Sequence, residues 1–149
     1  MKKFFFCAAA LLAAISFSAC SDDDENMLPA TPENIAGTWQ SIQEDGWAFK
    51  GGEKDTWSNK LPDEEDGWYM TYSFDKNGSY TESEYSDGDE DGFSTYGTYS
   101  ISGNKITLTT DYGSPAIREI TKLTDSRLVL VQGSTEAGYQ IAMTFKRIK

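Results

Sequence analysis

The chain has 149 residues, with 24 acidic and 13 basic side chains, two cysteines and no histidine. A net charge of −11 argues against nucleic-acid binding, which requires clustered lysine and arginine. Because the chain has no histidine, it lacks a residue that serine–histidine and cysteine–histidine catalysis and most zinc sites require. We therefore expect one domain that is not an enzyme and does not bind nucleic acid.

The N-terminus has the composition of an export signal. Lys2 and Lys3 precede an uncharged, largely apolar stretch from Phe4 to Ala19. This stretch spans 16 residues, whereas a helix that crosses a membrane needs roughly 20. We predict that residues 1–19 are a signal peptide that is removed, and not a permanent membrane helix.

The next feature is the junction Phe17-Ser18-Ala19-Cys20, which resembles the lipobox of bacterial lipoproteins, with phenylalanine in place of the usual leucine. The resemblance implies that Cys20 is acylated, with chains such as palmitate, and becomes the new N-terminus. The acidic run at 21–25 is similar to the tag that directs Bacteroidota lipoproteins to the cell surface; a solvated linker is the alternative. We expect a protein anchored in the outer membrane through Cys20 and exposed at the cell surface.

Residues 21–34 separate this cysteine from the first strand signal. They combine acidic residues and prolines with few apolar side chains, which is typical of a flexible spacer. We therefore assign 20–34 to the lipidated cysteine and an acidic tether, and 35–149 to the folded domain. Because Cys7 leaves with the signal and Cys20 is acylated, we expect no disulfide.

From Ile35 onward, short runs of aromatic and β-branched residues alternate with polar ones, and turn signals separate them. The eight expected strands cover residues 37–43, 68–74, 79–85, 93–101, 105–110, 116–123, 127–132 and 139–147. Eight consecutive antiparallel strands can close on themselves, which removes exposed sheet edges. We predict an all-β, eight-stranded up-and-down barrel, with a two-sheet β-sandwich as the alternative.

Connection lengths predict how such a barrel is oriented. Short turns follow the second, fourth and sixth expected strands, and longer segments follow the first, third, fifth and seventh. Alternate connections of an up-and-down barrel lie at the same end. One end is therefore closed by short turns, where the tether also enters, and the open mouth points away from the membrane.

Several short motifs carry a family resemblance. Gly37-Thr38-Trp39 resembles the G-x-W motif that opens lipocalins, and the patterns at 72–80 and 97–108 resemble lipocalin-like domains of bacterial lipoproteins. The resemblance covers Ile35 to Arg147 and implies a barrel with Trp39 packed across its floor. The Thr-Asp-Tyr motif and the helix of secreted animal lipocalins are missing, so the resemblance implies no ligand type.

The connection at 44–67 is long and contains three aromatic residues. We interpret it as a lid over the barrel mouth with hinges at Gly46, Gly51 and Gly52, or as a stacking platform for sugar rings. The alternative is that Trp47 and Trp57 complete the core. The residues expected to contact a ligand, from the barrel and this segment together, are Trp39, Trp47, Phe49, Trp57, Trp68, Tyr72 and Tyr99.

Two groups of carboxylates remain. Asp87, Asp89 and Asp91, followed by Gly92, match the first half of a calcium loop, although the twelfth position is Thr98. A weak calcium site or a solvated acidic loop fits this pattern, and we expect no other cofactor. Glu82 and Glu84 share one face of an expected strand; a glycosidase needs two such acids, but an outward polar face is the simpler interpretation.

The function predicted from these features is a monomeric, membrane-anchored module that binds a small apolar or amphipathic ligand in its barrel, gated by residues 44–67. The alternative is an interaction module with a filled barrel, which presents its aromatic and acidic loops to a protein or glycan. The presence or absence of an interior cavity distinguishes the two hypotheses.

Overall fold

The computed structural model describes residues 26–63, 65, 67–86 and 92–149. In this part of the chain, one helical turn, α1 (Pro32–Ile35), precedes nine strands. The strands are β1 (Gly37–Lys50), β2 (Glu53–Lys60), β3 (Tyr69–Phe74), β4 (Ser79–Tyr85), β5 (Phe93–Ser102), β6 (Lys105–Thr110), β7 (Ala116–Leu123), β8 (Arg127–Ser134) and β9 (Tyr139–Arg147). They form one antiparallel sheet in the order β2-β1-β3-β4-β5-β6-β7-β8-β9.

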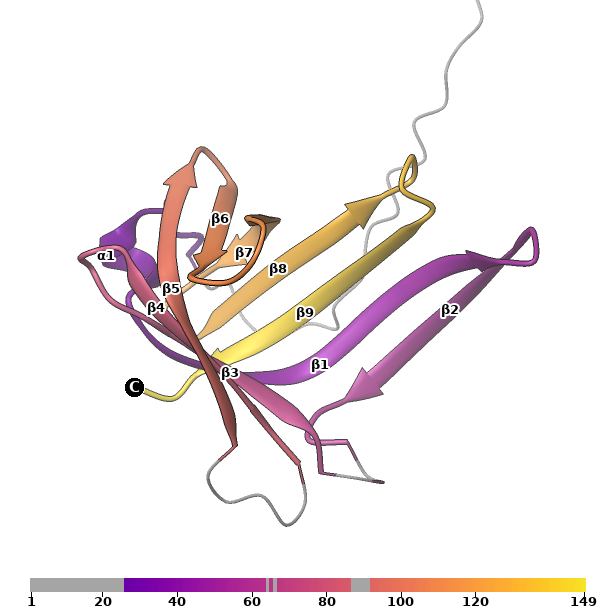
Figure 1. Cartoon of the computed structure of the whole chain (residues 1–149), viewed down its shortest axis with the longest axis horizontal. Helices are drawn as coiled ribbons and strands as arrows, with labels where there is room; N and C mark the ends of the chain where they lie inside the picture. The colour runs from indigo at the N-terminus through magenta and orange to yellow at the C-terminus, as the bar shows by residue number, and fades with distance from the viewer. Residues whose placement is uncertain (1–25, 64, 66, 87–91) are drawn as a thin grey trace, which may run out of the picture.

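An additional pairing between β1 and β9 closes β1 and β3 to β9 into an eight-stranded up-and-down barrel (Figure 1). This is the predicted architecture, and not the alternative two-sheet sandwich. Strands β4, β6, β7 and β9 have the predicted bounds, and β3, β5 and β8 differ by one or two residues at one end. The alternation expected of the strands is also confirmed in β3, where Met70, Tyr72 and Phe74 are buried on one face.

The prediction of a loop or lid at 44–67 is wrong. Strand β1 continues to Lys50, and β2 returns beside it with the register Gln43 to Lys60 and Lys50 to Glu53. Gly51 and Gly52 have φ values of 63° and 90° and form the hairpin turn, so they are not hinges. The predicted strand stops at Gln43 because charged residues interrupt the apolar alternation there, but hydrogen bonding to strands on both sides extends β1 regardless.

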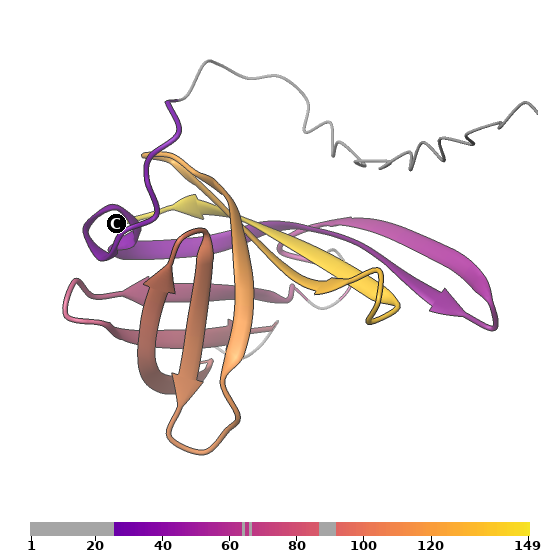
Figure 2. The same cartoon turned by 90° about the horizontal axis from the view of Figure 1, so that it is seen from above.

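This extension makes a sheet that shares β8 and β9 with the barrel. Residues 37–40 of β1 pair with β3, a register shift occurs between Ser41 and Gln43, and from Gln43 onward the chain pairs with β2. We call the four-stranded sheet formed by β2, residues 43–50 of β1, 139–144 of β9 and 129–134 of β8 the wing. Figures 1 and 2 show the two hairpins of the wing extending together beyond the remaining strands.

The closed end of the barrel is built around Trp39, whose side chain is fully buried as the G-x-W resemblance implies. Its indole Nε1 donates a hydrogen bond of 2.8 Å to the carbonyl of Ile35, the last residue of α1. The Arg147 guanidinium lies 4.1 Å from the Trp39 ring centroid and donates to the carbonyls of Asn34 and Asp125. This cation–π contact and these hydrogen bonds join the two ends of the domain.

The chain enters the barrel at this closed end. The Leu28 amide donates to the Leu123 carbonyl at 2.8 Å, and Leu28 and Ala30 pack against the core. Folded contacts therefore begin within the segment predicted as a tether, ahead of Ile35. The short turns also meet here, since the Tyr99 amide donates to the Gly78 carbonyl and the Arg147 amide to that of Ser126.

Aromatic side chains fill the barrel next to this floor. Tyr72 contacts the Phe74 and Phe145 rings with centroids 5.4 Å apart in each case, and Phe74 meets Tyr99 edge-on at 5.1 Å. Leucine and isoleucine side chains from β6, β7 and β8 complete the cluster. Such close packing leaves space for a ligand only toward the opposite, open end.

Candidate functional site

The open half of the barrel contains a cavity of about 110 Å³, which we call the cup. Its lining side chains come from β1, β3, β7, β8 and β9. They are Glu44, Met70, Tyr72, Arg118, Leu130, Gln132, Ile141, Met143 and Phe145. Met70 and Arg118 lie near the starts of β3 and β7, which follow the long connections, so the cup lies opposite the α1 end.

One side of the cup is apolar. Leu130 and Phe145 form its base and are almost fully buried, whereas Ile141 and Met143, which belong to the wing, are partly exposed. Thioether side chains such as those of Met70 and Met143 adapt to ligands of irregular shape. This surface can hold a short apolar group.

Polar side chains adjoin this apolar surface. Arg118 shares the inner face of β7 with the buried Ile120, and its guanidinium donates to the Gln132 side-chain oxygen from β8. Arg118 also has a side-chain hydrogen bond with Tyr72, which in turn bonds the Glu82 carboxyl. Four side chains from four strands therefore form a connected polar group beside the apolar surface.

Glu82 contradicts the interpretation of an outward acidic face on β4. It lies on the same face as Tyr80, whose side chain is 4% exposed in the core, and directly opposite Tyr72 on β3. The sequence signal was available, because counting in twos from Tyr80 places Glu82 inside. The same parity from Ile120 places Arg118 inside, so the alternation rule could have found both charged residues.

Burial affects the acid–base properties of this group. It raises the pKa of the Glu82 carboxyl, although hydrogen bonding to Tyr72 and attraction to Arg118 oppose the effect. Burial also raises the pKa of the Tyr72 and Tyr80 hydroxyls, with a further contribution from the negative charge of Glu82. Burial at this position therefore disfavours the ionised form of Glu82 relative to a carboxyl in water.

The inner face of the wing continues the cup surface. Gly46 pairs with Trp57 on β2 and with Ile141 on β9, so these residues share one face of the sheet. A Cβ at Gly46 would overlap the Trp57 ring, which therefore lies against the bare backbone. The Trp57 indole donates to the Glu44 carboxylate at 2.7 Å, and Glu44 lines the cup. Trp57 is consequently next to the cup rim.

Trp47 and Phe49 lie on the opposite, outer face of the wing. The Trp47 side chain is buried, with its indole donating to Gln140 at 3.3 Å and the Lys54 ammonium 4.7 Å above its ring. The Phe49 ring meets it edge-on with centroids 5.8 Å apart and is 54% exposed. The predicted aromatic platform is therefore divided between two faces of one sheet.

The remaining predicted ligand-binding residues are also separated. Tyr72 lines the cup, and Trp68 is partly buried against the core. Trp39 and Tyr99 are buried at the closed end, where the Tyr99 hydroxyl donates to the Asp75 carbonyl at 2.7 Å. Of the seven predicted residues, the structure places Tyr72 in the cavity wall and Trp57 beside it, whereas Trp39 and Tyr99 belong to the floor.

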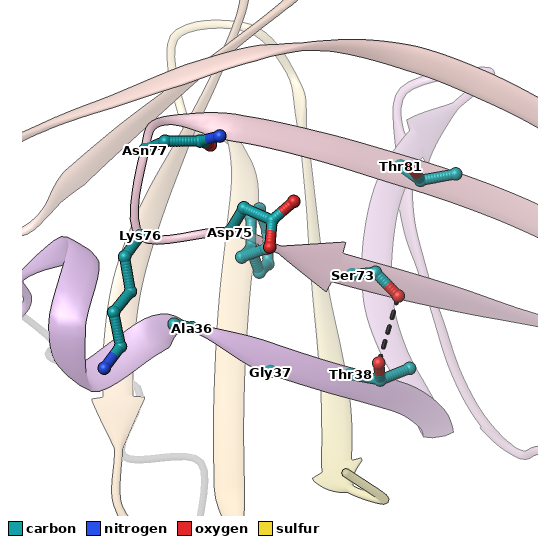
Figure 3. Close-up of a pocket in the computed structure, with 9 residues that line it drawn as sticks. Ala36, Gly37, Thr38, Ser73, Asp75, Lys76, Asn77 and Thr81 are labelled. Carbon is teal, nitrogen blue, oxygen red and sulfur yellow. Dashed lines mark hydrogen bonds between the residues drawn. The ribbon is translucent and has the colours of Figure 1, made fainter.

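A larger, open groove of about 640 Å³ lies on the outside of the barrel. Figure 3 shows Thr38, Ser73 and Thr81 in a row across its strands, with Thr38 and Ser73 hydroxyls 3.1 Å apart. The adjoining Asp75 and Asn77 side chains already accept hydrogen bonds from Ser79 in the turn. The groove is lined largely by polar side chains, and Asp75 and Asn77 are already engaged in the turn, so the cup with its apolar base is the better candidate for an amphipathic ligand.

The predicted calcium ligands Asp87, Asp89 and Asp91 lie outside the described residues. Across 26–63, 65, 67–86 and 92–149, no three acidic or cysteine side chains are grouped to hold a metal ion. Over the same ranges, no helix has the length and apolarity needed to cross a membrane.

Comparison with known proteins identifies the family. Residues 35–130 match the family described as lipocalin-like domain. Among solved structures, a lipocalin-like protein from Bacteroides uniformis is 18% identical, covering 77% of this chain and 99% of its own, with a TM-score of 0.49. An uncharacterized protein from Bacteroides eggerthii is 15% identical, with coverages of 75% and 98% and a TM-score of 0.48. A search of curated proteins gives no match. Because the family match spans more than half of the sequence, this chain belongs to the lipocalin-like domain family.

Proposed function

We propose that this protein is a non-enzymatic, lipid-anchored binding module that holds a small amphipathic ligand in the cup and along the inner face of the wing. The observation that carries the proposal is the composition of the cup. Leu130, Ile141 and Met143 provide an apolar surface beside Arg118 and Gln132, at the open end of a barrel whose other half is filled. Ligand sites in proteins commonly combine such an apolar lining with a few polar groups.

The size of the cup limits what enters it. Typical pockets for drug-sized ligands measure about 300–1,000 Å³, whereas the cup measures about 110 Å³. Only one end of a ligand fits, and the rest lies along the wing over Ile141 and the Gly46–Trp57 contact. The wing thus takes the place of the predicted lid as the second part of the binding surface.

Anchoring through Cys20 is part of the same proposal, and the barrel orientation supports it. The chain enters at the α1 end, where Leu28 bonds to Leu123, and the cup lies at the other end. A domain tethered through residues 20–27 in the outer membrane would therefore present its cup and wing away from the bilayer. This is the useful direction for capturing a ligand outside the cell.

A second candidate function is an interaction module for a protein or glycan. Exposed apolar side chains favour this function, because contact between such groups and water is unfavourable in free energy. Phe49, Phe93, Tyr96 and Ile117 are each more than half exposed. They come from the wing, from β5 and from β7, and they do not line the cup.

Native mass spectrometry of the protein extracted from its own membrane tests both parts of the proposal. We expect a polypeptide that begins at an acylated Cys20 and carries one added small-molecule mass. Met143→Trp, which fills the cup, should lose the added mass, whereas Thr144→Trp on the other face of β9 should keep it. An unprocessed Met1 start would refute the anchor, and an added mass retained in Met143→Trp would refute the cup as the site.

A further inference from the structure

Arg118 is the cationic residue in the cup wall. It lies on the inner face of β7, next to Gln132 of β8 and on the same face as the buried Ile120. Its side chain is half-buried, so its charge is less hydrated than that of a surface arginine. An arginine placed on the inner face of a barrel requires a partner that satisfies its charge.

The hydrogen-bond partners of Arg118 in the described part of the chain are neutral. They are the Gln132 side-chain oxygen and Tyr72. A guanidinium carries five N–H donors in a planar arrangement that matches a carboxylate. These two contacts therefore leave donors for an acceptor that enters the cup.

Glu82 interacts with Tyr72 through a side-chain hydrogen bond and with Arg118 through its charge. The titratable groups facing Glu82 are Tyr72 from β3, Tyr80 and Glu84 from β4, and Arg118 from β7. Burial disfavours the ionised form of Glu82, which reduces its competition with an incoming anion for Arg118.

We propose that Arg118 binds the anionic head, such as a carboxylate, of a single-chain amphiphile whose apolar part contacts Leu130, Ile141 and Met143. This inference rests on the proposed function and specifies its ligand class. The Gln132 amide nitrogen supplies a second donor, since its oxygen is engaged by Arg118. The limited volume of the cup favours a compact head over a large phospholipid head group.

Isothermal titration calorimetry with three eight-carbon probes tests the inference on the mature domain. Octanoate, 1-octanol and octyltrimethylammonium share the same chain and differ in head charge. At pH 7.5 we expect octanoate to bind at least tenfold more tightly than the other two. Arg118→Met should weaken octanoate binding at least tenfold and leave octanol binding unchanged, whereas Arg127→Met, on β8 outside the cup, should affect neither.

A second variant gains affinity, and so separates recognition from misfolding. Glu82→Gln removes the competing acid and should tighten octanoate binding at least threefold at pH 7.5, with no change for octanol. Equal binding of the three probes, or tightest binding of octyltrimethylammonium, would overturn the anionic head and leave the proposed function standing. Failure of all three to bind the native domain would overturn the proposed function as well.

Discussion

At the scale of single residues, the site depends on two charged side chains at inward positions of strands. Glu82 and Arg118 interrupt the apolar alternation of β4 and β7, and the fold tolerates them because Tyr72 and Gln132 supply hydrogen bonds. Alternation predicts the direction in which they point. Composition alone does not, since charged residues are most often found in water.

Glu82→Gln should stabilise the domain in a pH-dependent manner. Because the folded state raises the pKa of this carboxyl, the native protein loses stability as pH increases from the unfolded value through the folded one. The variant has no proton to lose. Its free energy of unfolding should match the native value at acidic pH and exceed it at neutral pH, measured by urea denaturation at both. A constant difference across this range would contradict the role of burial.

At the scale of elements, the barrel strands and the wing differ in how far the sequence predicts them. Strands such as β3 bury every second residue, so the alternation of buried and exposed positions can be predicted from their sequence. Strand β2 has one half-buried residue, Trp57, and otherwise faces water. Its clearest signal is Gly51-Gly52, a dipeptide typical of two-residue hairpin turns, which we interpreted as a hinge.

The hairpin turn can be tested through its positive φ angles. Replacing Gly51 and Gly52 by alanine should cost about 1–2 kcal/mol per residue in the left-handed region. Amide hydrogen exchange in β2 should accelerate at least tenfold, while β6 keeps its protection. Gly103→Ala, at φ 60° in the turn between β5 and β6, is the matched control and should affect β6 instead. Equal exchange of β2 in both variants would argue against the hairpin.

At the scale of the whole molecule, the closed barrel and its end-to-end asymmetry follow from strand count and connection lengths. The division of the interior into a filled floor and an open cup does not follow from strand count and connection lengths. Trp39 and Tyr99 are aromatic residues on strands just as Tyr72 is, yet they form the floor and Tyr72 lines the cup. Whether an aromatic side chain fills the interior or borders a cavity depends on three-dimensional packing. A shift of one residue in the pairing of a strand would move its side chains to the other face of the sheet.

The central claim, that the cup and the wing bind the ligand, is tested most directly by methyl NMR of the mature domain with labelled methionines. Met70 and Met143 line the cup, whereas Met27 is 60% exposed in the N-terminal segment and serves as the internal control. On titration with octanoate, the Met70 and Met143 methyl signals should shift together and saturate at one affinity, and Met27 should not move. Saturable binding that leaves the Met70 and Met143 signals in place would contradict the account.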